Sequence, residues 1–409
     1  MSDPKRVSDL ELSPNNGEIR FAVPRFLTPF KNPPKMKQLS TNRRDFISTT
    51  VSAGVSAGLA AGLAQGGFFS APTYANENKK LGFALVGLGG LATNQIAPGL
   101  LTSSHCKLTA IVTGTPEKEK KWADKYGIGR DHIYNYESFD KIASDDSVDV
   151  IYIVLPNSMH AEYTIRAAKA GKHVLCEKPM ANTAADCRDM IAACKAADRK
   201  LAVGYRCQYE PHHLKSMEMA HNKELGAIKM IEAGFGFKIG DPTQWRLKKK
   251  LAGGGALMDV GIYALQACRC LLREEPTMIT AQETKTDAVK FAEVDESVTW
   301  LMKFPSGVLA YCSTSYNFNG LNRFNAFTEN GFIRMDPAYS YTNNRMETSK
   351  GKVELPQQDQ FATEMDEFAK CILENKPSKV AGEEGLKDLL AIEAIYKSME
   401  TRTTVTLQS

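Results

Sequence analysis

Lys178, Asp259 and Tyr263 are side chains of the types that move a proton beside a hydride donor or acceptor. Lys178 is followed directly by Pro179, which restricts the backbone and so fixes the direction of the lysine. Asp259 and Tyr263 lie four residues apart in a run expected to be a helix from about 256 to 272, so they project from the same face. We predict that these three residues are catalytic. The alternative for Asp259 and Tyr263 is a half-buried packing pair.

The tyrosine needs help to act at neutral pH. A phenol with a pKa of about 10 is a poor proton donor or acceptor there unless its anion is stabilised. An ammonium group such as that of Lys178 would lower the pKa of Tyr263. We therefore expect Tyr263 to be the general acid/base, with Asp259 orienting a substrate hydroxyl.

A glycine turn precedes these residues by about ninety positions. The apolar run 81–86 is typical of a buried parallel strand, and a helix-compatible stretch follows the turn. In this order of strand, turn and helix, Gly87 permits the tight turn and Gly89 lets a pyrophosphate approach the backbone, while Ala92 allows close packing of helix on strand. The pattern predicts a dinucleotide site. Its alternative is a glycine-rich turn without a ligand.

The end of the next expected strand, 107–112, indicates which dinucleotide is bound. Proteins that bind NAD usually carry an acidic residue here for the ribose 2′-hydroxyl, but this chain has Thr113. A hydroxyl at Thr113, the backbone N–H of Gly114 and the cation of Lys118 would bind a 2′-phosphate, so NADP is the predicted cofactor. The nearby carboxylate of Glu117 is the one feature that opposes this prediction.

Two further apolar runs, 148–155 and 172–176, are expected to be parallel strands whose carboxyl ends meet at the same edge of a sheet. Ser158 is expected to cap the helix after the first run, which extends to about residue 170. The residues after the two strands should border the nicotinamide half of the cofactor: Asn157, His160, Glu177 and Lys178. As alternatives, His160 belongs only to the first turn of a helix and Glu177 is a surface acid.

The second half of the chain changes in pattern. From about residue 227 it contains β-rich runs that follow one another closely and are expected to pair antiparallel: 228–237, 277–284, 297–304, 308–316 and 332–335. We predict an α/β protein with an N-terminal Rossmann-type doubly wound parallel sheet and a C-terminal α+β domain with an open, largely antiparallel sheet. One face of that sheet would cover the helix of Asp259 and Tyr263. The other, if apolar, would need a partner, which predicts a homodimer or homotetramer.

The front of the chain resembles an export signal. Arg43 and Arg44 form a twin-arginine pattern, and no charged residue occurs from Phe46 to Asn76. We predict export of the folded protein to the periplasm by the twin-arginine route, with cleavage after about Ala75 and no stable membrane association afterwards. An uncleaved anchor is the alternative. Because residues 1–35 fit no signal, we predict that translation begins at Met36.

The predicted domains are therefore the N-terminal extension and signal, 1–75; the NADP-binding Rossmann domain, 80–204; and the substrate-binding and oligomerisation domain, 205–409. Residues 1–75 carry nine of the 51 basic and five of the 47 acidic residues, so the remainder has 42 of each. This balance gives no reason to expect nucleic-acid binding. Nine cysteines and seven histidines without paired metal spacing predict neither a disulfide framework nor a metal site.

Together these residues resemble the Gfo/Idh/MocA family of sugar-linked dehydrogenases, over roughly residues 80 to 405. The resemblance rests on five short motifs besides the glycine turn and the pair Asp259 and Tyr263: Leu155-Pro156-Asn157-Ser158, Cys176-Glu177-Lys178-Pro179-Met180, Trp245-Arg246-Leu247, Met335-Asp336-Pro337-Ala338 and Gly382-Glu383-Glu384-Gly385. Many relatives have His where this chain has Tyr263, and the tyrosine is similar to the glucose-fructose oxidoreductase branch.

The resemblance implies a role for each site residue. Lys178 would position substrate and nicotinamide, Tyr263 would be the general acid/base, and Asp259 would help to bind the sugar. The residues implied to contact NADP are Gly87, Leu88, Gly89, Gly90, Leu91, Thr113, Gly114, Lys118, Leu155, Pro156, Asn157, His160, Glu177, Lys178, Arg206, Trp245 and Arg246.

The implied reaction is a hydride exchange in which an aldose is oxidised to its lactone and a second sugar is reduced through bound NADP(H). Only residues 76–80 separate the expected cleavage point from the first strand, whereas that branch carries a Pro-rich arm that helps enclose its cofactor. The alternatives are therefore an ordinary NADP-dependent sugar dehydrogenase or reductase, or an aldose-aldose oxidoreductase, with an exchanging cofactor. An NAD-dependent glycosidase and a non-catalytic sugar sensor fit the residues less well.

Overall fold

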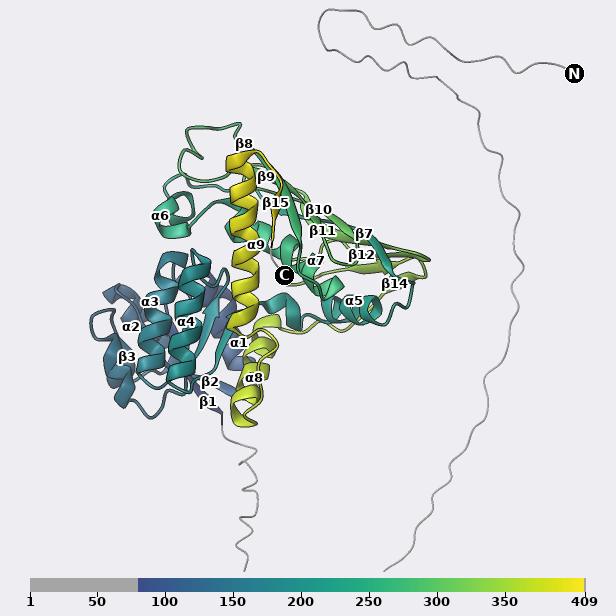
Figure 1. The fold of residues 1–409 in the computed structure, drawn as a ribbon. Helices are drawn as coiled ribbons and strands as arrows, with labels where there is room; N and C mark the ends of the chain where they lie inside the picture. The colour runs from purple at the N-terminus through teal and green to yellow at the C-terminus, as the bar shows by residue number, and fades with distance from the viewer. Residues whose placement is uncertain (1–79, 408–409) are drawn as a thin grey trace, which may run out of the picture. The chain divides into compact units, whose positions relative to one another are not determined.

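A computed structural model describes residues 80–407 of the 409-residue chain (Figure 1). The predicted export signal, its cleavage point and the start at Met36 lie outside the described residues.

The first domain is built on a six-stranded, fully parallel sheet in the order β3-β2-β1-β4-β5-β6. Its strands are β1 (Leu81–Val86), β2 (Cys106–Val112), β3 (Ile133–Tyr134), β4 (Val150–Ile153), β5 (His173–Glu177) and β6 (Leu201–Gly204). Its helices are α1 (Ala97–Thr102), α2 (Pro116–Tyr126), α3 (His160–Lys169) and α4 (Ala184–Ala196). This strand order is that of the dinucleotide-binding Rossmann fold, as predicted.

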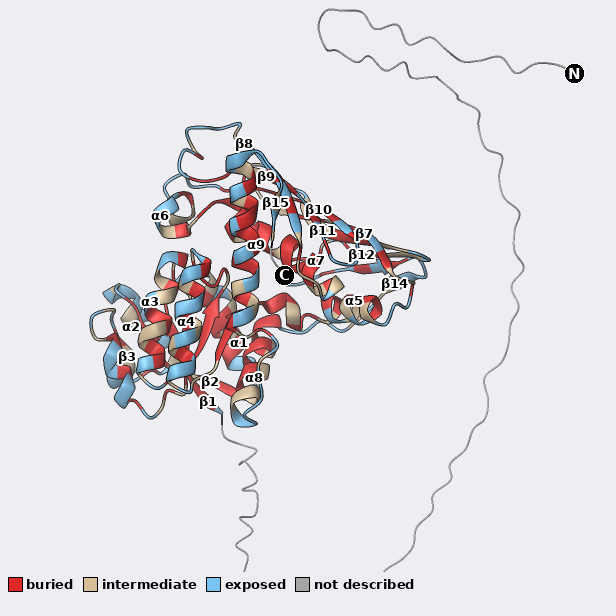
Figure 2. Cartoon of the chain, viewed as in Figure 1, coloured by how far each residue is buried: buried red, intermediate tan, exposed pale blue. Residues whose placement is uncertain are grey.

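The strands of this sheet are apolar because helices cover both faces. Every residue of β1 and β4 is buried, and red, the colour of buried residues, lies between the helices of this domain in Figure 2. A parallel sheet buried on both faces needs near-continuous apolar strands, which is the pattern that the sequence shows.

The second domain contains a nine-stranded sheet in the order β14-β13-β12-β11-β7-β10-β9-β8-β15. Only β7 and β10 pair in parallel; all other neighbours are antiparallel. The strands are β7 (Ile228–Gly236), β8 (Met278–Thr284), β9 (Ser297–Lys303), β10 (Leu309–Ser315), β11 (Leu321–Thr328), β12 (Gly331–Met335), β13 (Met346–Thr348), β14 (Gly351–Val353) and β15 (Val405–Thr406). The prediction of an open, largely antiparallel sheet is confirmed.

Five helices complete the second half: α5 (Pro211–His221), α6 (Lys249–Ala252), α7 (Ile262–Leu272), α8 (Gln360–Leu373) and α9 (Gly382–Thr401). Helix α7 packs on β7 and β10, so the sheet covers the helix of Tyr263 as expected. Helix α9, yellow in Figure 1, packs against α4 on one side and β8 on the other. Helix α8 returns to α1 and β2 of the first domain, so the end of the chain contributes to both domains.

The structure corrects two local predictions. Ser158 does not cap α3, because a 3-10 turn from Asn157 to Met159 precedes the helix and Met159 occupies the cap position without a side-chain bond. The expected helix 256–272 begins as a π-helical segment, Leu257–Gly261, before α7.

Among residues 80–407, only the stretch Lys249–Leu272 is long and apolar enough to span a membrane, and most of it is buried within the protein.

Candidate active site

A cavity of about 570 Å³ opens at the carboxyl ends of the first sheet, where ligands of open α/β folds bind. Glu177 and Lys178 from the end of β5, Gly204 from the end of β6 and Leu91 from the glycine turn line one side. The other side is lined by Arg206 after β6 and by residues of β7, the loop after β7, the helical segment 257–272, β11, the loop after β12 and α8: Phe235, Phe237, Ile239, Gly240, Gln244, Arg246, Asp259, Val260, Tyr263, Asn322, Tyr339, Ser340, Tyr341 and Phe361.

Lys178 and Asp259 meet in this cavity. The ammonium Nζ of Lys178 donates to the carboxylate Oδ1 of Asp259 at 3.0 Å and to its backbone carbonyl oxygen at 2.6 Å. The other carboxylate oxygen, Oδ2, accepts from Arg246 Nε at 3.1 Å and from the hydroxyl of Tyr316 at 2.7 Å. Two oxygens of Asp259 therefore bind Lys178, and the third is held by Arg246 and Tyr316, so Asp259 fixes the position of the lysine.

Charge in this cluster is stabilised by pairing. Burial opposes ionisation of Asp259, but the Lys178 ammonium and the Arg246 guanidinium outweigh it and hold the pKa of Asp259 well below its usual range. Burial likewise disfavours the Lys178 ammonium, yet the charge of Asp259 raises the pKa of the lysine. Lys178 is thus a fixed cation and Asp259 a fixed anion at neutral pH.

The ring of Tyr263 lies beside two cations, Lys178 and Arg206. Its ring centre is 5.0 Å from Lys178 Nζ and 5.0 Å from Arg206 Cζ, and the ring packs edge-on against Phe235. Burial raises the pKa of the Tyr263 phenol, and the two cations offset only part of that effect. As expected, the charge of Lys178 lowers the pKa of Tyr263. The net change is nevertheless a raised pKa, contrary to expectation, because desolvation is the larger effect.

A buried carboxylate fixes where the helical segment of Asp259 begins. Asp295 accepts from the backbone N–H of Gly255 at 2.7 Å and from that of Leu257 at 2.8 Å, and Tyr396 donates to it at 2.7 Å. A side chain at Gly255 would collide with the backbone of Asp295, so glycine is required there. Asp295 lies 40 residues away from Gly255 along the chain, so no local sequence pattern predicts this contact.

The glycine turn has the shape of a pyrophosphate cradle. Gly87 has φ +93°, and a Cβ there would lie 2.5 Å from the carbonyl oxygen of Val154, so only glycine fits. An added Cβ at Gly89 would meet nothing within 4 Å, and at Gly90 it would meet only Asn94 Nδ2 at 4.0 Å. The backbone is therefore open to a ligand at the start of the helical run 90–102, while Leu88 points into the core.

In the predicted 2′-phosphate pocket, the N–H and the hydroxyl of Thr113 already make hydrogen bonds to the backbone of the chain. Thr113 is buried; its N–H donates to Tyr134 O, and its hydroxyl oxygen accepts from the N–H of Thr115 at 3.2 Å. Lys118 is exposed, and the ring of Tyr136 lies against Gly114. No acidic side chain stands at the end of β2, so the residues fit a 2′-phosphate better than a free ribose hydroxyl pair.

Two comparisons of sequence bear on this arrangement. The profile described as "Oxidoreductase family, NAD-binding Rossmann fold" matches residues 81–205, and the Gfo/Idh/MocA C-terminal domain matches residues 213–334. A D-xylose 1-dehydrogenase (NADP⁺) of Haloarcula marismortui is 32% identical over 80% of this chain and 92% of its own. The chain belongs to the Gfo/Idh/MocA oxidoreductase family.

Solved structures agree with this membership. The aldose-aldose oxidoreductase of Caulobacter crescentus, crystallised with glycerol, is 44% identical, covers 80% of this chain and 100% of its own, and has a TM-score of 0.79. The myo-inositol 2-dehydrogenase of Lactobacillus plantarum is 21% identical, covers 81% of this chain and 100% of its own, and has a TM-score of 0.69, which shows the shared fold alone. As a Gfo/Idh/MocA protein, the chain is an oxidoreductase, as predicted.

In this Gfo/Idh/MocA chain, the loop after β4 is tied to the lysine turn. The His160 ring lies between two carbonyl oxygens, Nδ1 at 2.9 Å from Pro179 O and Nε2 at 2.9 Å from Leu155 O, and is fully buried. His160 thus joins the loop of Leu155 and Pro156 to the turn that carries Lys178, and its contact with the cofactor stays a prediction. Asn157 is also buried, and its amide donates to Ala252 O at 2.8 Å.

Arg206 and Arg246 hold the site together from the second domain. The guanidinium of Arg206 donates to Tyr339 O at 2.6 Å and to Gln360 Oε1 at 2.7 Å. It also stacks on the ring of Tyr341, with Cζ 4.6 Å from the ring centre. Arg246 stacks on Trp245 at 4.7 Å while it binds Asp259. Both arginines reach the cavity, and cofactor contact by Arg206, Trp245 and Arg246 stays a prediction.

Glu177 is not a surface acid but part of a buried chain of hydrogen bonds. The Tyr152 hydroxyl lies 2.8 Å from Glu177 Oε1 and 3.4 Å from Glu364 Oε2, and all three side chains are buried. A phenol has one proton, so it can donate to only one of two carboxylates. Glu177 also accepts from the N–H of Lys178 at 3.2 Å, so it is the ionised partner, and the protonated Glu364 donates to Tyr152.

Burial supports this assignment. It raises the pKa of Glu364 well above its usual range, and the neighbouring charge of Glu177 raises it further. Burial also raises the pKa of Glu177, but Lys178 and Tyr152 oppose the rise. Sequence reasoning missed both Tyr152 and Glu364, since one lies within an apolar strand and the other 187 positions beyond Glu177 along the chain.

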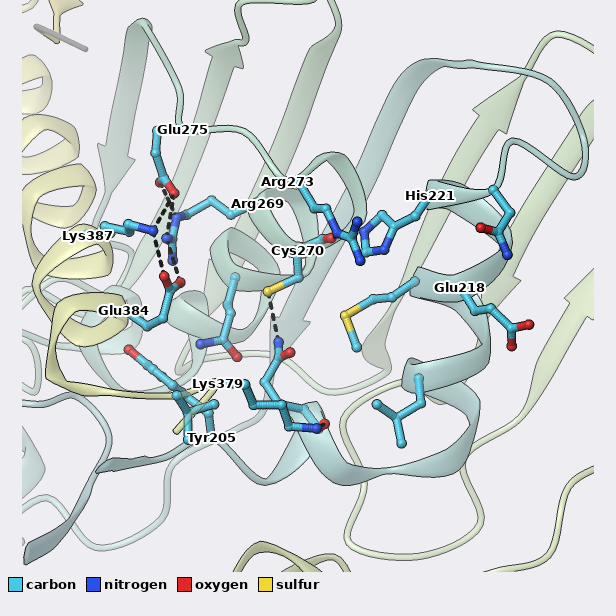
Figure 3. Close-up of a pocket in the computed structure, with 16 residues that line it drawn as sticks. Tyr205, Glu218, His221, Arg269, Cys270, Arg273, Glu275, Lys379, Glu384 and Lys387 are labelled. Carbon is cyan, nitrogen blue, oxygen red and sulfur yellow. Dashed lines mark hydrogen bonds and ion pairs between the residues drawn. The ribbon is translucent and has the colours of Figure 1, made fainter. Parts of the chain in front are cut away.

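A second cavity, of about 640 Å³, lies along α5, α7 and α9 (Figure 3). Its buried guanidinium is already paired: Arg269 binds Glu275, Glu384 and the buried Asp388, and the nearby Lys387 binds Glu384. Lys379 donates to Gln208 O at 2.6 Å. This network joins α7 to α9, and it holds none of the predicted catalytic residues of the Gfo/Idh/MocA site. Among residues 80–407, no group of three or more His, Cys, Asp or Glu could hold a metal.

Proposed function

We propose that this protein is an NADP-dependent sugar oxidoreductase that transfers hydride between two sugars, oxidising one aldose to its lactone and reducing a second aldose to its alcohol. The observation that carries the proposal is the meeting of Lys178, Asp259 and Tyr263 in a single cavity beside the glycine turn. The 44% identity to a protein named aldose-aldose oxidoreductase supports the choice of substrates.

Bound NADP would supply the acceptor for the hydride from C1 of the first sugar and the donor of that hydride to the second. The protein moves the accompanying proton. The phenolate of Tyr263 takes the hydroxyl proton as the C1–H bond of the first sugar breaks, and the phenol returns it to the carbonyl oxygen of the second. Lys178, fixed by Asp259, stabilises the phenolate and the developing charge on the sugar oxygen.

The choice of NADP rests on residues and on relatives. The end of β2 offers Thr113, Gly114 and Lys118 in place of a carboxylate, and a carboxylate there would repel a 2′-phosphate. The relative at 32% identity is named for NADP⁺. The open backbone at Gly89 and Gly90 fits the pyrophosphate that NADP and NAD share.

The sequence favoured fructose as the second sugar, by resemblance to the glucose-fructose oxidoreductase branch. The 44% relative supports an aldose instead. The two proposals differ in one respect that is simple to test, since an aldose-aldose enzyme converts a single aldose into equal amounts of lactone and alcohol, whereas the other needs a ketose.

The experiment is therefore to purify the protein without adding nucleotide, so that any bound NADP is retained, and to incubate it with glucose alone. We expect lactone and sorbitol in equal amounts without added cofactor. Product only with added NADP would indicate an ordinary dehydrogenase, and sorbitol only with fructose present would indicate the glucose-fructose reaction. Release of free sugar from an aryl glycoside without lactone would contradict sugar oxidation and favour the glycosidase branch.

We propose further that the enzyme acts in the periplasm. A cofactor that need not leave between the two half-reactions suits a compartment without an NADPH pool, and the twin-arginine route carries folded proteins. Replacing Arg43 and Arg44 by lysine should leave the protein in the cytoplasm, and cell fractionation tests this. An unchanged periplasmic fraction would contradict the proposed route.

A further inference from the structure

A third cavity lies at the amino ends of the strands of the first sheet, opposite the carboxyl ends where the catalytic cavity opens. Its volume is about 500 Å³, and it lies where β5 and β6 begin, at His173 and Leu201. The segment before α9 and the end of α8 close it. It is lined by His173, Ile191, Cys194, Lys195, Asp198, Arg199, Lys200, Leu201, Ile372, Asn375, Pro377, Ser378, Ala381, Gly382 and Glu383.

Two donors in this cavity face one another without an acceptor. The backbone N–H of Lys200 donates to His173 Nδ1 at 2.9 Å, so the proton of the neutral imidazole is on Nε2. Arg199 NH1 lies 3.5 Å from that Nε2. Because both groups donate, this contact is not a hydrogen bond, and each N–H has its hydrogen-bonding capacity unused there.

The guanidinium of Arg199 has a further unused donor. Its Nε is buried and has no hydrogen-bond acceptor among the described residues. A buried N–H without an acceptor costs about 1–3 kcal/mol, so such groups in folded proteins usually face a bound water or ligand. Among the described residues, the facing N–H groups of Arg199 NH1 and His173 Nε2 and the separate N–H of Arg199 Nε thus have no acceptor.

The local charge is positive. Lys195, Arg199 and Lys200 line the cavity against two exposed carboxylates, Asp198 and Glu383. This charge affects His173. Burial is the largest cause that lowers the pKa of His173 to about 4, and the cations of Arg199 and Lys200 lower it further, while Asp149 and Asp198 oppose the change.

Two other features suit an anion. The 20-residue helix α9 begins in the cavity at Gly382, and the first backbone N–H groups of a helix lack partners within the helix. The cavity wall also includes apolar side chains, Ile191, Leu201 and Ile372, that can contact the body of a small molecule. The cavity of Figure 3 offers no such available guanidinium, because its buried Arg269 is already bound by three carboxylates.

We propose that this cavity binds an oxyanion, the phosphate or carboxylate group of a small molecule, through the Arg199 guanidinium and the Nε2–H of His173. The site is separate from the catalytic cavity, and its test does not depend on which reaction the enzyme catalyses. A guanidinium fork matches both anions, and the planar or tetrahedral form of the anion decides which it prefers.

The test is a calorimetric titration of the purified protein with inorganic phosphate and, separately, with gluconate, each compared with sodium chloride at equal ionic strength. We expect saturable binding of one or both anions and none of chloride. Arg199→Gln should weaken that binding by about tenfold or more, the usual loss for a charge-assisted bond. Arg188→Gln is the matched control, because Arg188 is an exposed arginine of α4 that does not line the cavity.

A second measurement covers the case in which Arg199→Gln does not fold. In the wild-type protein, the ¹⁵N resonance of His173 Nε2 should shift as phosphate or gluconate is added, and the Nδ1 resonance should shift less. Titrations in which neither anion binds more tightly than chloride would overturn the proposal. An equal loss of binding in Arg188→Gln, or an unmoved His173 resonance at saturating anion, would overturn it as well.

Discussion

Tyr263 is subject to two opposing influences, a buried setting that raises the pKa of its phenol and two cations that lower it. The sum is a raised pKa, so the side chain is a neutral phenol at neutral pH. That form can donate a proton to a carbonyl oxygen. Oxidation of a sugar needs the phenolate, which becomes more abundant as pH rises toward the pKa.

This predicts a pH profile for the oxidation half-reaction. Its rate should increase with pH up to the pKa of Tyr263 and then level off, while the reduction half-reaction should fall over the same range. Single-turnover measurements with each sugar at a series of pH values check this. Tyr263→Phe should lower both rates by about 10²–10⁴-fold, the usual contribution of a general acid/base, without weakening NADP binding. A variant that keeps most of its activity would remove Tyr263 from the proton path.

Glu364 provides a second prediction among single side chains. Its folded-state pKa is raised, so the folded protein keeps the proton while the unfolded chain loses it above the ordinary glutamate pKa. The wild-type protein should therefore lose stability as pH rises from about 4, by at most about 1.4 kcal/mol per pH unit for one proton. Glu364→Gln keeps a donor to Tyr152 and cannot ionise, so it should not show this loss.

Denaturant unfolding of both proteins between acidic and mildly alkaline pH measures the difference. We expect the stability of Glu364→Gln relative to the wild type to increase with pH. A difference that is constant with pH would mean that Glu364 has the same protonation in both states, contrary to the hydrogen-bond chain described above.

At the level of elements, the glycine turn separates a structural role from a binding role. Gly87→Ala forces a left-handed conformation on alanine and brings its Cβ against Val154 O, so we expect a loss of about 1–3 kcal/mol in stability. Gly89→Ala has free space around it and should leave the unfolding midpoint unchanged, but should weaken NADP binding.

Thermal unfolding and nucleotide titration of the two variants compare these roles directly. Equal binding of NADP by Gly89→Ala and the wild-type protein would show that the pyrophosphate does not approach the backbone there.

The elements themselves were largely predictable from the sequence. The strands β1, β2, β4 and β5 are apolar runs bounded by turn residues, and the strands β7 to β10 also coincide with predicted runs, although β7 and β10 pair in parallel and not antiparallel as expected. Strand β11 escaped prediction because Asn322, Arg323 and Asn325 interrupt its apolar pattern. Those polar side chains are accommodated by partners on other strands, such as Glu232, which binds Arg323.

The site was predictable in its members but not in its interactions. The identity of Lys178, Asp259 and Tyr263 follows from residue types and spacing. That Tyr316 and Arg246 occupy one oxygen of Asp259, or that burial dominates the pKa of Tyr263, depends on contacts between segments 13 to 57 positions apart and on the solvent exposure of each group. Such contacts leave no periodic trace in the sequence.

At the level of the whole molecule, no element among residues 80–407 covers one face of the large sheet. Leu301 on β9 and Tyr311 on β10 are opposite each other on this face, as are Leu309 and Met230, and all four are exposed. An exposed apolar face of this kind marks an interface in most soluble proteins. We propose that two copies of the chain associate through it, with the twofold symmetry usual for homodimers.

Replacing both Leu301 and Tyr311 by lysine should then yield a monomer, because four like charges would meet in the interface of each pair of chains. Light scattering after gel filtration measures the mass. A wild-type protein that is monomeric at micromolar concentration, or a double variant of unchanged mass, would contradict association through this face.

Hydride transfer between two sugars in the cavity of Lys178, Asp259 and Tyr263 is tested most directly with an isotope. The protein is incubated with one aldose carrying deuterium at C1, which serves as both donor and acceptor, and an excess of unlabelled NADPH, and the alcohol formed is analysed by mass spectrometry. We predict two deuterium atoms in nearly every molecule of that alcohol, its own and the one transferred from a second sugar. An alcohol that carries only its own deuterium atom would contradict the exchange.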